Sequence, residues 1–210
     1  MLVKERMTKD PVCIEPHTSV LDALAVLKKH NVRRLPVCEN GRLVGLVTQM
    51  DLLKASPSEA TSLSVWELNY LISKTTVSDI MARRPVTVTP DMPVEEAALI
   101  MRDKRIGGLP VVESDKLVGI ITETDIFDAF VDLAGVRRGG VRVTLMLEDK
   151  TGSLAHVAKM AEEHSVNILS VSTLPPLDGF GESVWRLSGE RVEEFIQALK
   201  DRGIKVLHVA

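Results

Sequence analysis

The sequence predicts a mixed α/β chain (α+β) in which two β-α-β-β-α repeats are followed by a β-α-β-β-α-β domain. The first observation is an internal repeat, because residues 3–55 align without a gap with residues 77–129 after a shift of 74 positions. Short apolar segments and amphipathic segments also alternate in the same order in both copies. Finally, the pattern changes after the glycine-rich segment 135–140. We therefore expect a first repeat, a linker with a packing helix, a second repeat, a hinge and a C-terminal domain, at residues 1–55, 56–76, 77–133, 134–140 and 141–210.

The first repeat begins with an extended piece at 12–14, which precedes an amphipathic helix over 20–30. A strand at 35–39, a polar turn and a strand at 43–47 follow, and the last strand runs directly into a helix that begins at Thr48. An ungapped match over about fifty residues indicates duplicated structural units, so the second copy is expected to fold in the same way.

The linker has two parts. Residues 56–62 have the Ser- and Pro-rich composition of a connecting segment. In the following LSVWELNYLISK, Leu63, Trp66 and Tyr70 fall on one helical stripe. This stripe favours a helix that packs on the core, with a surface for docking a partner as the alternative.

In the C-terminal domain, the spacing of apolar residues alternates between the period of a strand and that of a helix. We expect strands at 141–147, 166–174, 182–188 and 204–209, and helices at 153–164 and 190–202. Gly203 is a suitable C-terminal cap for the second helix. The order β-α-β-β-α-β is that of the ferredoxin-like arrangement.

Composition excludes several classes of function. A net charge of −3 with only 3% aromatic residues argues against a nucleic-acid partner. No apolar segment is long enough to cross a membrane and the N-terminus lacks a secretory pattern, so we expect a cytoplasmic protein without a membrane partner. Cys13 and Cys38 form no CxxC motif and are interpreted as small buried thiols.

No catalytic or metal-binding motif is recognisable. The five histidines lack metal-ligand spacing, and no phosphate-binding glycine loop or nucleophile with a partner base occurs. We therefore expect no catalytic residue, no metal and no cofactor, and a protein that is not an enzyme.

The turn after the second strand of each repeat carries the sequence Thr-x-x-Asp, at Thr48–Asp51 and Thr122–Asp125. One interpretation is a capping box, in which Thr and Asp satisfy the free N–H groups at the start of a helix. The other is a ligand site, in which the carboxylate accepts hydrogen bonds from ribose hydroxyls. The strand glycines Gly45 and Gly119 indicate close backbone approach by a packed neighbour or by a ligand.

With its x-L-P-V strand and Gly-h-h-Thr-x-x-Asp turn, the repeat resembles the CBS domain, named after cystathionine β-synthase. The resemblance covers roughly residues 1–133. It implies two units paired with pseudo-twofold symmetry and two clefts for adenosine-containing ligands such as AMP, ADP, ATP, S-adenosylmethionine or NAD. It also implies ribose-binding carboxylates at Asp51 and Asp125.

The repeats differ just before the x-L-P-V strand, where Arg33-Arg34 aligns with Gly107-Gly108. The resemblance implies a phosphate contact for basic residues at this position, and arginine suits phosphate oxygens. We expect one cleft to prefer a phosphorylated nucleotide and the other to take a weaker or uncharged adenosyl ligand; a solvated surface pair is the alternative. Because clefts of this family often combine both repeats, the resemblance implies that Arg33 or Arg34 acts beside Thr122 and Asp125. The candidate nucleotide-binding residues are Thr48, Asp51, Thr122, Asp125, Arg33, Arg34, Pro36 and Pro110.

The C-terminal domain resembles the ACT domain. The residues that carry this resemblance are those of the loop 148–154 and Val166-Asn167-Ile168. This resemblance implies dimerisation and an amino-acid site at an interface between copies, although Thr151 replaces the usual proline of the loop. The candidate ligand or interface residues are Asp149, Gly152, Ser153, Leu154, Asn167 and Ile168.

The combination resembles bacterial acetoin-utilisation proteins of the CBS-plus-ACT type, including the segment 62–74. The resemblance implies a homodimeric regulatory protein that binds an adenine nucleotide or S-adenosylmethionine as a regulatory ligand and controls a partner enzyme. Two alternatives stay open: a structural dimeric adaptor without a ligand, and an enzyme with an unrecognised site.

Overall fold

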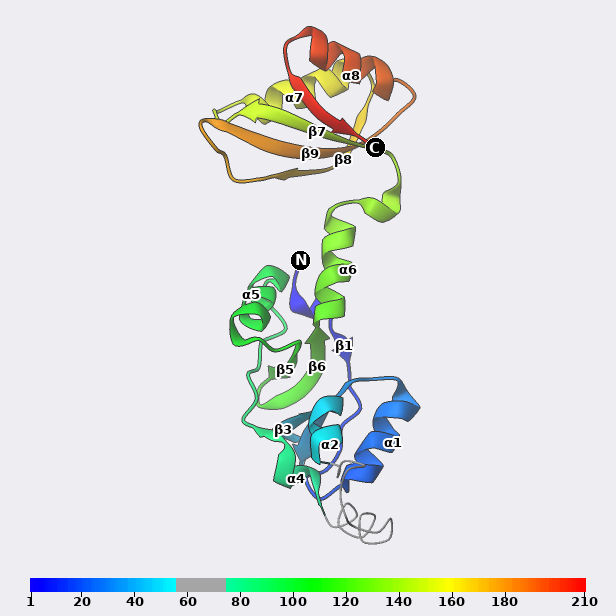
Figure 1. Ribbon diagram of the computed structural model, residues 1–210, viewed down its shortest axis with the longest axis vertical. Coiled ribbons are helices and arrows are strands. Elements are labelled where there is room, and N and C mark those ends of the chain that lie inside the picture. Colours follow the sequence, from blue (N-terminus) through cyan, green and yellow to red (C-terminus); the bar gives the residue numbers. More distant parts are fainter. Residues whose placement is uncertain (56–74) are drawn as a thin grey trace. The chain divides into compact units, whose positions relative to one another are not determined.

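The computed structural model describes residues 1–55 and 75–210, so the linker stripe at Leu63, Trp66 and Tyr70 lies outside the described residues. The chain divides into two compact units, Met1–Phe127 and Asp128–Ala210 (Figure 1). The mixed α/β architecture expected from the sequence is confirmed in both units.

The first repeat folds as η1 (Val3–Glu5), β1 (Thr8–Lys9), α1 (Val20–His30), β2 (Arg34–Glu39), β3 (Arg42–Thr48) and α2 (Gln49–Ala55). Helix α1 has the predicted bounds because both ends are capped. The Ser19 hydroxyl accepts a hydrogen bond from the Asp22 N–H at 3.1 Å, and Asn31 ends the helix in the left-handed conformation. Apolar side chains of the helices and strands, including Ala23, Leu35 and Leu52, form the core of this repeat.

The second repeat folds as α4 (Val77–Ile80), β4 (Ala82–Arg83), α5 (Val94–Lys104), β5 (Gly108–Glu113), β6 (Lys116–Thr122) and α6 (Glu123–Leu133). The correspondence with the first repeat extends to the strand register. Pro36 is paired with Leu46 in the first hairpin, and Pro110 is paired with Ile120 in the second. The duplication in the sequence is therefore a duplication of the structure.

The two repeats exchange their first strands. Strand β1 of the first repeat pairs with β6 of the second, as Figure 1 shows. Strand β4 of the second repeat pairs with β3 of the first, so the two sheets are β1-β6-β5 and β2-β3-β4. This exchange explains the strand glycines. A Cβ added at Gly45 would collide with the side chain of Met81, and one added at Gly119 would collide with that of Met7. A packed neighbour, rather than a ligand, occupies the space that each glycine leaves.

The C-terminal unit contains η2 (Val136–Arg138), β7 (Val141–Glu148), α7 (Ser153–Glu163), β8 (Asn167–Thr173), β9 (Phe180–Ser188), α8 (Val192–Asp201) and β10 (Lys205–Val209). Its antiparallel sheet has the order β10-β7-β9-β8, and both helices cover one face (Figure 1). Trp185 and Phe195 are among the fully buried side chains between the sheet and these helices. This is the ferredoxin-like order expected from the sequence.

The segment 134–140 is fastened to the sheet of the C-terminal unit. Arg186 donates hydrogen bonds to the carbonyl oxygens of Ala134 at 3.2 Å and of Gly139 at 3.3 Å, and the Ser170 hydroxyl donates to Ala134 at 2.9 Å. A Cβ added at Gly140 would collide with the backbone of Leu187. Gly140 therefore allows close packing here.

Candidate functional site: two related clefts

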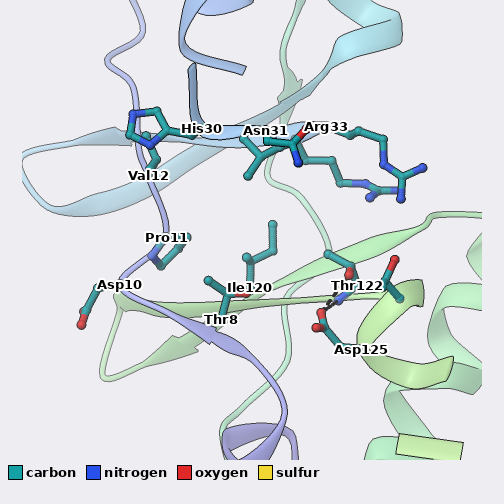
Figure 2. A pocket seen from close by; sticks show the side chains of 13 residues that line it. Thr8, Asp10, Pro11, Val12, His30, Asn31, Arg33, Ile120, Thr122 and Asp125 are labelled. Carbon is teal, nitrogen blue, oxygen red and sulfur yellow. Dashed lines mark hydrogen bonds between the residues drawn. The ribbon is translucent and has the colours of Figure 1, made fainter. Parts of the chain in front are cut away.

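Two clefts in the first unit combine residues from both repeats. The first, which we call the Asp125 cleft, has a volume of about 430 Å³. It is lined by Thr8, Asp10, Pro11, Val12, His30, Asn31, Val32, Arg33, Arg34, Ile120, Thr122, Thr124 and Asp125. Figure 2 shows side chains of the first repeat facing those of the second across it: His30, Asn31 and Arg33 opposite Ile120, Thr122 and Asp125.

The second cleft, which we call the Asp51 cleft, has a volume of about 480 Å³. It is lined by Arg34, Leu46, Thr48, Asp51, Ala82, Arg83, Arg84, Pro85, Val86, Arg105, Ile106, Gly107 and Gly108. Most of these positions are the 74-residue equivalents of positions in the Asp125 cleft, so the two sites are related by the internal repeat. Both volumes fall in the range of small-molecule sites.

Each cleft contains a Thr-x-x-Asp capping box at a strand-to-helix turn. The Asp51 carboxylate accepts hydrogen bonds at Oδ2 from the Thr48 N–H at 2.9 Å and from the Thr48 hydroxyl at 2.6 Å. Asp125 Oδ2 accepts the same pair from Thr122, at 2.7 and 2.8 Å (Figure 2). Within the part of the chain that the structure describes, both carboxylates accept their hydrogen bonds from the threonine at Oδ2, which leaves Oδ1 for a ligand.

The same Thr-Asp turn can therefore cap a helix and bind a ligand. The chain contains a further turn of this type with which the two cleft turns can be compared. A third Thr-x-x-Asp turn, at Thr76–Asp79, has the same hydrogen bonds, with the Thr76 N–H and hydroxyl both 2.8 Å from Asp79 Oδ2. These hydrogen bonds lower the pKa of the Asp79 carboxyl below its ordinary value. Asp79 lines neither of the two clefts, so the motif alone identifies a helix start and its position identifies the site.

Arg34 lines both clefts. Its guanidinium lies over Gly107 and Gly108, where an added Cβ would collide with or crowd the arginine side chain. Burial lowers the pKa of the Arg34 guanidinium, and the nearby Glu123 carboxylate opposes that shift. The aligned glycines of the second repeat thus provide the space for the arginine of the first.

The other predicted residues of this unit are divided between cleft and core. Arg33 lines the Asp125 cleft together with Thr122 and Asp125, the grouping expected from the sequence. Pro36 and Pro110 are buried in β2 and β5 and line neither cleft. Their carbonyl oxygens accept hydrogen bonds from the N–H groups of Ile14 and Val88, both at 3.1 Å, which hold the preceding segments on the sheets.

Sequence reasoning missed the basic residues of the Asp51 cleft, namely Arg83, Arg84 and Arg105. The signal was present, because Arg83-Arg84 precedes the repeated proline where the first repeat has Lys9-Asp10. The sequence alone does not place these arginines near Asp51, because that placement depends on the strand exchange. The exchange brings the start of one repeat to the Thr-Asp turn of the other.

The expectation that both cysteines are buried is wrong for Cys13. Its side chain is exposed and that of Cys38 is half-buried, with 3.3 Å between the two sulfur atoms. Ile14, the next residue, is buried in the core, and successive residues of an extended segment point to opposite sides. Cys13 therefore faces outward.

In the C-terminal unit, the predicted loop lines two clefts. A cleft of about 450 Å³ includes Lys150, Gly152, Ser153, His156 and Arg202. One of about 250 Å³ includes Asp149 and Leu154. Gly152 has φ +93°, and the Ser153 hydroxyl donates a hydrogen bond to the Glu148 carbonyl at 2.8 Å.

The remaining two candidates of this unit lie elsewhere. Asn167 pairs with Ser188 and Ile168 with Leu187, whereas Glu148 pairs with Phe180 at the other end of β9. Asn167 and Ile168 are therefore at the opposite end of the sheet from the loop 149–154 within one copy of the chain. Ile168 packs against the core.

Two negative results concern the described residues alone. Among residues 1–55 and 75–210, no group of three or more His, Cys, Asp or Glu side chains could hold a metal ion. In the same ranges, no helix is long and apolar enough to span a membrane.

Comparison with solved structures gives the same fold for the first unit. The CBS domain pair of protein MJ0100, in complex with 5′-methylthioadenosine and S-adenosyl-L-methionine, is 34% identical, with a TM-score of 0.53 over 63% of this chain and 97% of that one. CBSX2 in complex with AMP is 34% identical, with a TM-score of 0.52 over 62% and 96%. A putative acetoin utilization protein (AcuB) from Vibrio cholerae is 29% identical, with a TM-score of 0.54 over 66% and 96%.

Curated relatives include much longer proteins. The chain is 34% identical to L-aspartate semialdehyde sulfurtransferase from Methanocaldococcus jannaschii over 131 residues, which are 61% of this chain and 23% of that protein. It therefore spans less than a quarter of that enzyme. CBS and ACT domains are regulatory modules, and enzymes of this kind carry a CBS pair as one part of a longer chain.

Family models account for nearly all of the described chain. The CBS domain matches residues 3–58 and 77–132, and the TTHA0829-like ACT domain matches residues 139–210. With the two exchanged repeats, the related clefts and the C-terminal sheet, these matches show that the chain belongs to the CBS-domain family, as a tandem CBS pair followed by a TTHA0829-like ACT domain.

Proposed function

We propose that this protein is a regulatory sensor of adenosyl compounds, which bind in the Asp51 and Asp125 clefts, and that it is not itself an enzyme. The observation that carries the proposal is the pair of equivalent Thr-Asp turns, each with its carboxylate Oδ1 free of the capping hydrogen bonds. The complexes of MJ0100 and CBSX2 with adenosyl ligands support the same class of ligand.

The physical mechanism is population shift. A ligand that binds one arrangement of the protein better than another stabilises that arrangement. A ligand present at 100 times its dissociation constant contributes about 2.7 kcal/mol, which is enough to change a marginal equilibrium. The regulated target is a partner enzyme, for which the acetoin-utilisation resemblance of the chain suggests a metabolic role.

The test is a thermal-shift screen followed by calorimetry, with AMP, ADP, ATP, S-adenosylmethionine and NAD. We expect at least one of these compounds to raise the melting temperature of the wild-type protein. Asp51→Ala and Asp125→Ala should each abolish binding in one cleft, because each removes the proposed ribose acceptor.

Asp79→Ala is the matched control, because it removes the same type of capping box outside both clefts. It should lower stability without changing the affinity for any adenosyl compound. If none of the compounds binds the wild-type protein, the sensor proposal fails and the ligand-free adaptor becomes the better description.

The ACT domain is proposed to contribute an amino-acid site and an interface between copies. Lys150 and Arg202 lie around the larger cleft of this unit, where their two cationic groups can hold a carboxylate. A thermal-shift screen with the twenty amino acids tests this proposal, and stabilisation that is lost in Arg202→Ala would support it. An unchanged melting temperature with all twenty would reject it.

A further inference from the structure

The two clefts differ strongly in charge. Four arginines, Arg34, Arg83, Arg84 and Arg105, line the Asp51 cleft against the single carboxylate of Asp51, which leaves a formal charge of +3. In the Asp125 cleft, Arg33 and Arg34 are balanced by Asp10 and Asp125, so the formal charge is zero with His30 neutral. A concave site lined by one sign of charge concentrates ligands of the opposite sign.

Two of these arginines occupy backbone conformations that arginine does not favour. Arg84 has φ +53° and Arg105 has φ +55°, both in the left-handed region. The first repeat places Asp10 (φ +47°) and Asn31 (φ +51°) at the equivalent positions, residue types that tolerate this region well. Arginine at both positions of the second repeat is unfavourable for folding, which points to a use for its charge.

Arg34 does not cancel the difference between the clefts. It lies at the boundary of both, and the Glu123 carboxylate is close enough to raise its pKa against the effect of burial. The asymmetry therefore comes from side chains that belong to one cleft each: Arg83, Arg84 and Arg105 on one side, and Asp10 and Arg33 on the other.

We propose that the two clefts take different chemical classes of adenosyl ligand. The Asp51 cleft binds an adenosine polyphosphate, whose phosphate oxygens meet the arginines of the second repeat. The Asp125 cleft binds an adenosyl compound without a net negative charge, such as a thioether nucleoside. This assignment reverses the expectation from the sequence, which placed the phosphate contact of Arg33 or Arg34 beside Asp125, because Asp10 and Asp125 balance these two arginines. This inference rests on the proposed function, since it assigns ligands to the same two sites.

Calorimetry with ATP and with 5′-methylthioadenosine tests the assignment on the full chain. Asp51→Ala should abolish ATP binding and leave 5′-methylthioadenosine binding unchanged, and Asp125→Ala should do the reverse. If ATP binding is lost in Asp125→Ala and kept in Asp51→Ala, the assignment is overturned while the sensor function stands. If neither compound binds the wild-type protein, the assignment of ligands to clefts fails. The sensor function then stands only if another adenosyl compound of the thermal-shift screen binds.

A charge exchange between equivalent positions provides the sharper variants. Arg84→Asp with Arg105→Asn gives the second repeat the residues that the first repeat already carries at the same backbone conformation. We expect this double variant to weaken ATP binding at least about tenfold, since a hydrogen bond to a charged group contributes enough for that change. Binding of 5′-methylthioadenosine should not change.

The reverse exchange, Asp10→Arg with Asn31→Arg, makes the Asp125 cleft cationic. We expect a second ATP site to appear, detected as a stoichiometry that rises from one to two in calorimetry. Because arginine is already accepted at both equivalent positions, this variant should fold. Unchanged ATP affinity in the first variant together with unchanged stoichiometry in the second would overturn the proposal.

Discussion

At the scale of single residues, the Thr-x-x-Asp motif has one local geometry and two uses. Its hydrogen bonds are nearly the same at Asp51, Asp125 and Asp79. What differs is the surroundings, because the first two carboxylates line clefts and the third does not. A capping motif therefore identifies the start of a helix from sequence, whereas its role in binding depends on what the fold places opposite it.

The Asp79 carboxyl gives a prediction on pH. Hydrogen bonds from Thr76 lower its pKa below the ordinary value of 3.8, so the folded state favours the ionised form. Its contribution to stability is present above pH 3.8 and is lost as the pH falls through the lower, folded-state value. Denaturation curves should show wild type more stable than Asp79→Asn at pH 7, with the difference shrinking below pH 3.8; a difference independent of pH would contradict this.

Arg105 gives a prediction on the relation between stability and binding. Its left-handed conformation, at the end of α5, suits asparagine or glycine better than arginine. We expect Arg105→Asn to raise the free energy of unfolding by about 0.5–1 kcal/mol while weakening ATP binding. Chemical denaturation and calorimetry measure the two effects, and Arg102→Asn, at an exposed helical position, is the control.

At the scale of elements, strand exchange is the feature that forms the clefts. Strands β1 and β4 each have only two residues, yet each carries its following residues to the Thr-Asp turn of the other repeat. The exchange depends on the close approach of Met7 to Gly119 and of Met81 to Gly45.

Gly45 tests the packing of the exchanged strands. We expect Gly45→Ala to lower the free energy of unfolding by about 1–3 kcal/mol, because its Cβ crowds the Met81 side chain in a close-packed interface. Met81→Ala should relieve this collision. In a double-mutant cycle, the variant with both changes should therefore lose less free energy of unfolding than the sum of the losses in the two single variants. Additive effects in the cycle would show that the two side chains do not interact.

The exposed apolar side chains of helix α6 give a prediction about the proposed homodimer. Phe127 and Phe130 have exposed fractions of 69% and 67%, and Leu133 has 60%, at a spacing that places them along one side of the helix. Such an exposed apolar stripe is typical of an interface, and we propose a second copy of the chain as its partner. Light scattering should find a dimer for wild type and a larger monomer fraction for Phe127→Glu with Phe130→Glu, because this change removes the contact through α6 and leaves the proposed ACT interface. Glu123→Gln on the same helix should stay dimeric, and an unchanged dimer fraction in the double phenylalanine variant would contradict a role for α6.

At the scale of the whole molecule, the unequal charges of the two clefts predict unequal sensitivity to salt. Attraction between ATP and the arginines of the Asp51 cleft is screened as ionic strength rises, and the Debye length falls from about 10 Å at 0.1 M to about 3 Å at 1 M. We expect ATP affinity to fall several-fold over this range and 5′-methylthioadenosine affinity to change little. Equal salt dependence of the two ligands in calorimetry would contradict the charge difference.

The sequence by itself determined the repeat, the order of elements and the family resemblances, because these depend on local periodicity and on matching positions along the chain. The bounds of α1 follow from Ser19 and Asn31, whereas the grouping of Arg33 with Asp125 in one cleft was implied only by the family resemblance. The tertiary structure decided which residues face each other. Arg84 and Asp51 line the same cleft, and Met81 packs over Gly45, because strands are exchanged between the repeats. Arg34 lies over Gly108 because the two repeats pack against each other, and each of these pairs joins positions far apart in the chain.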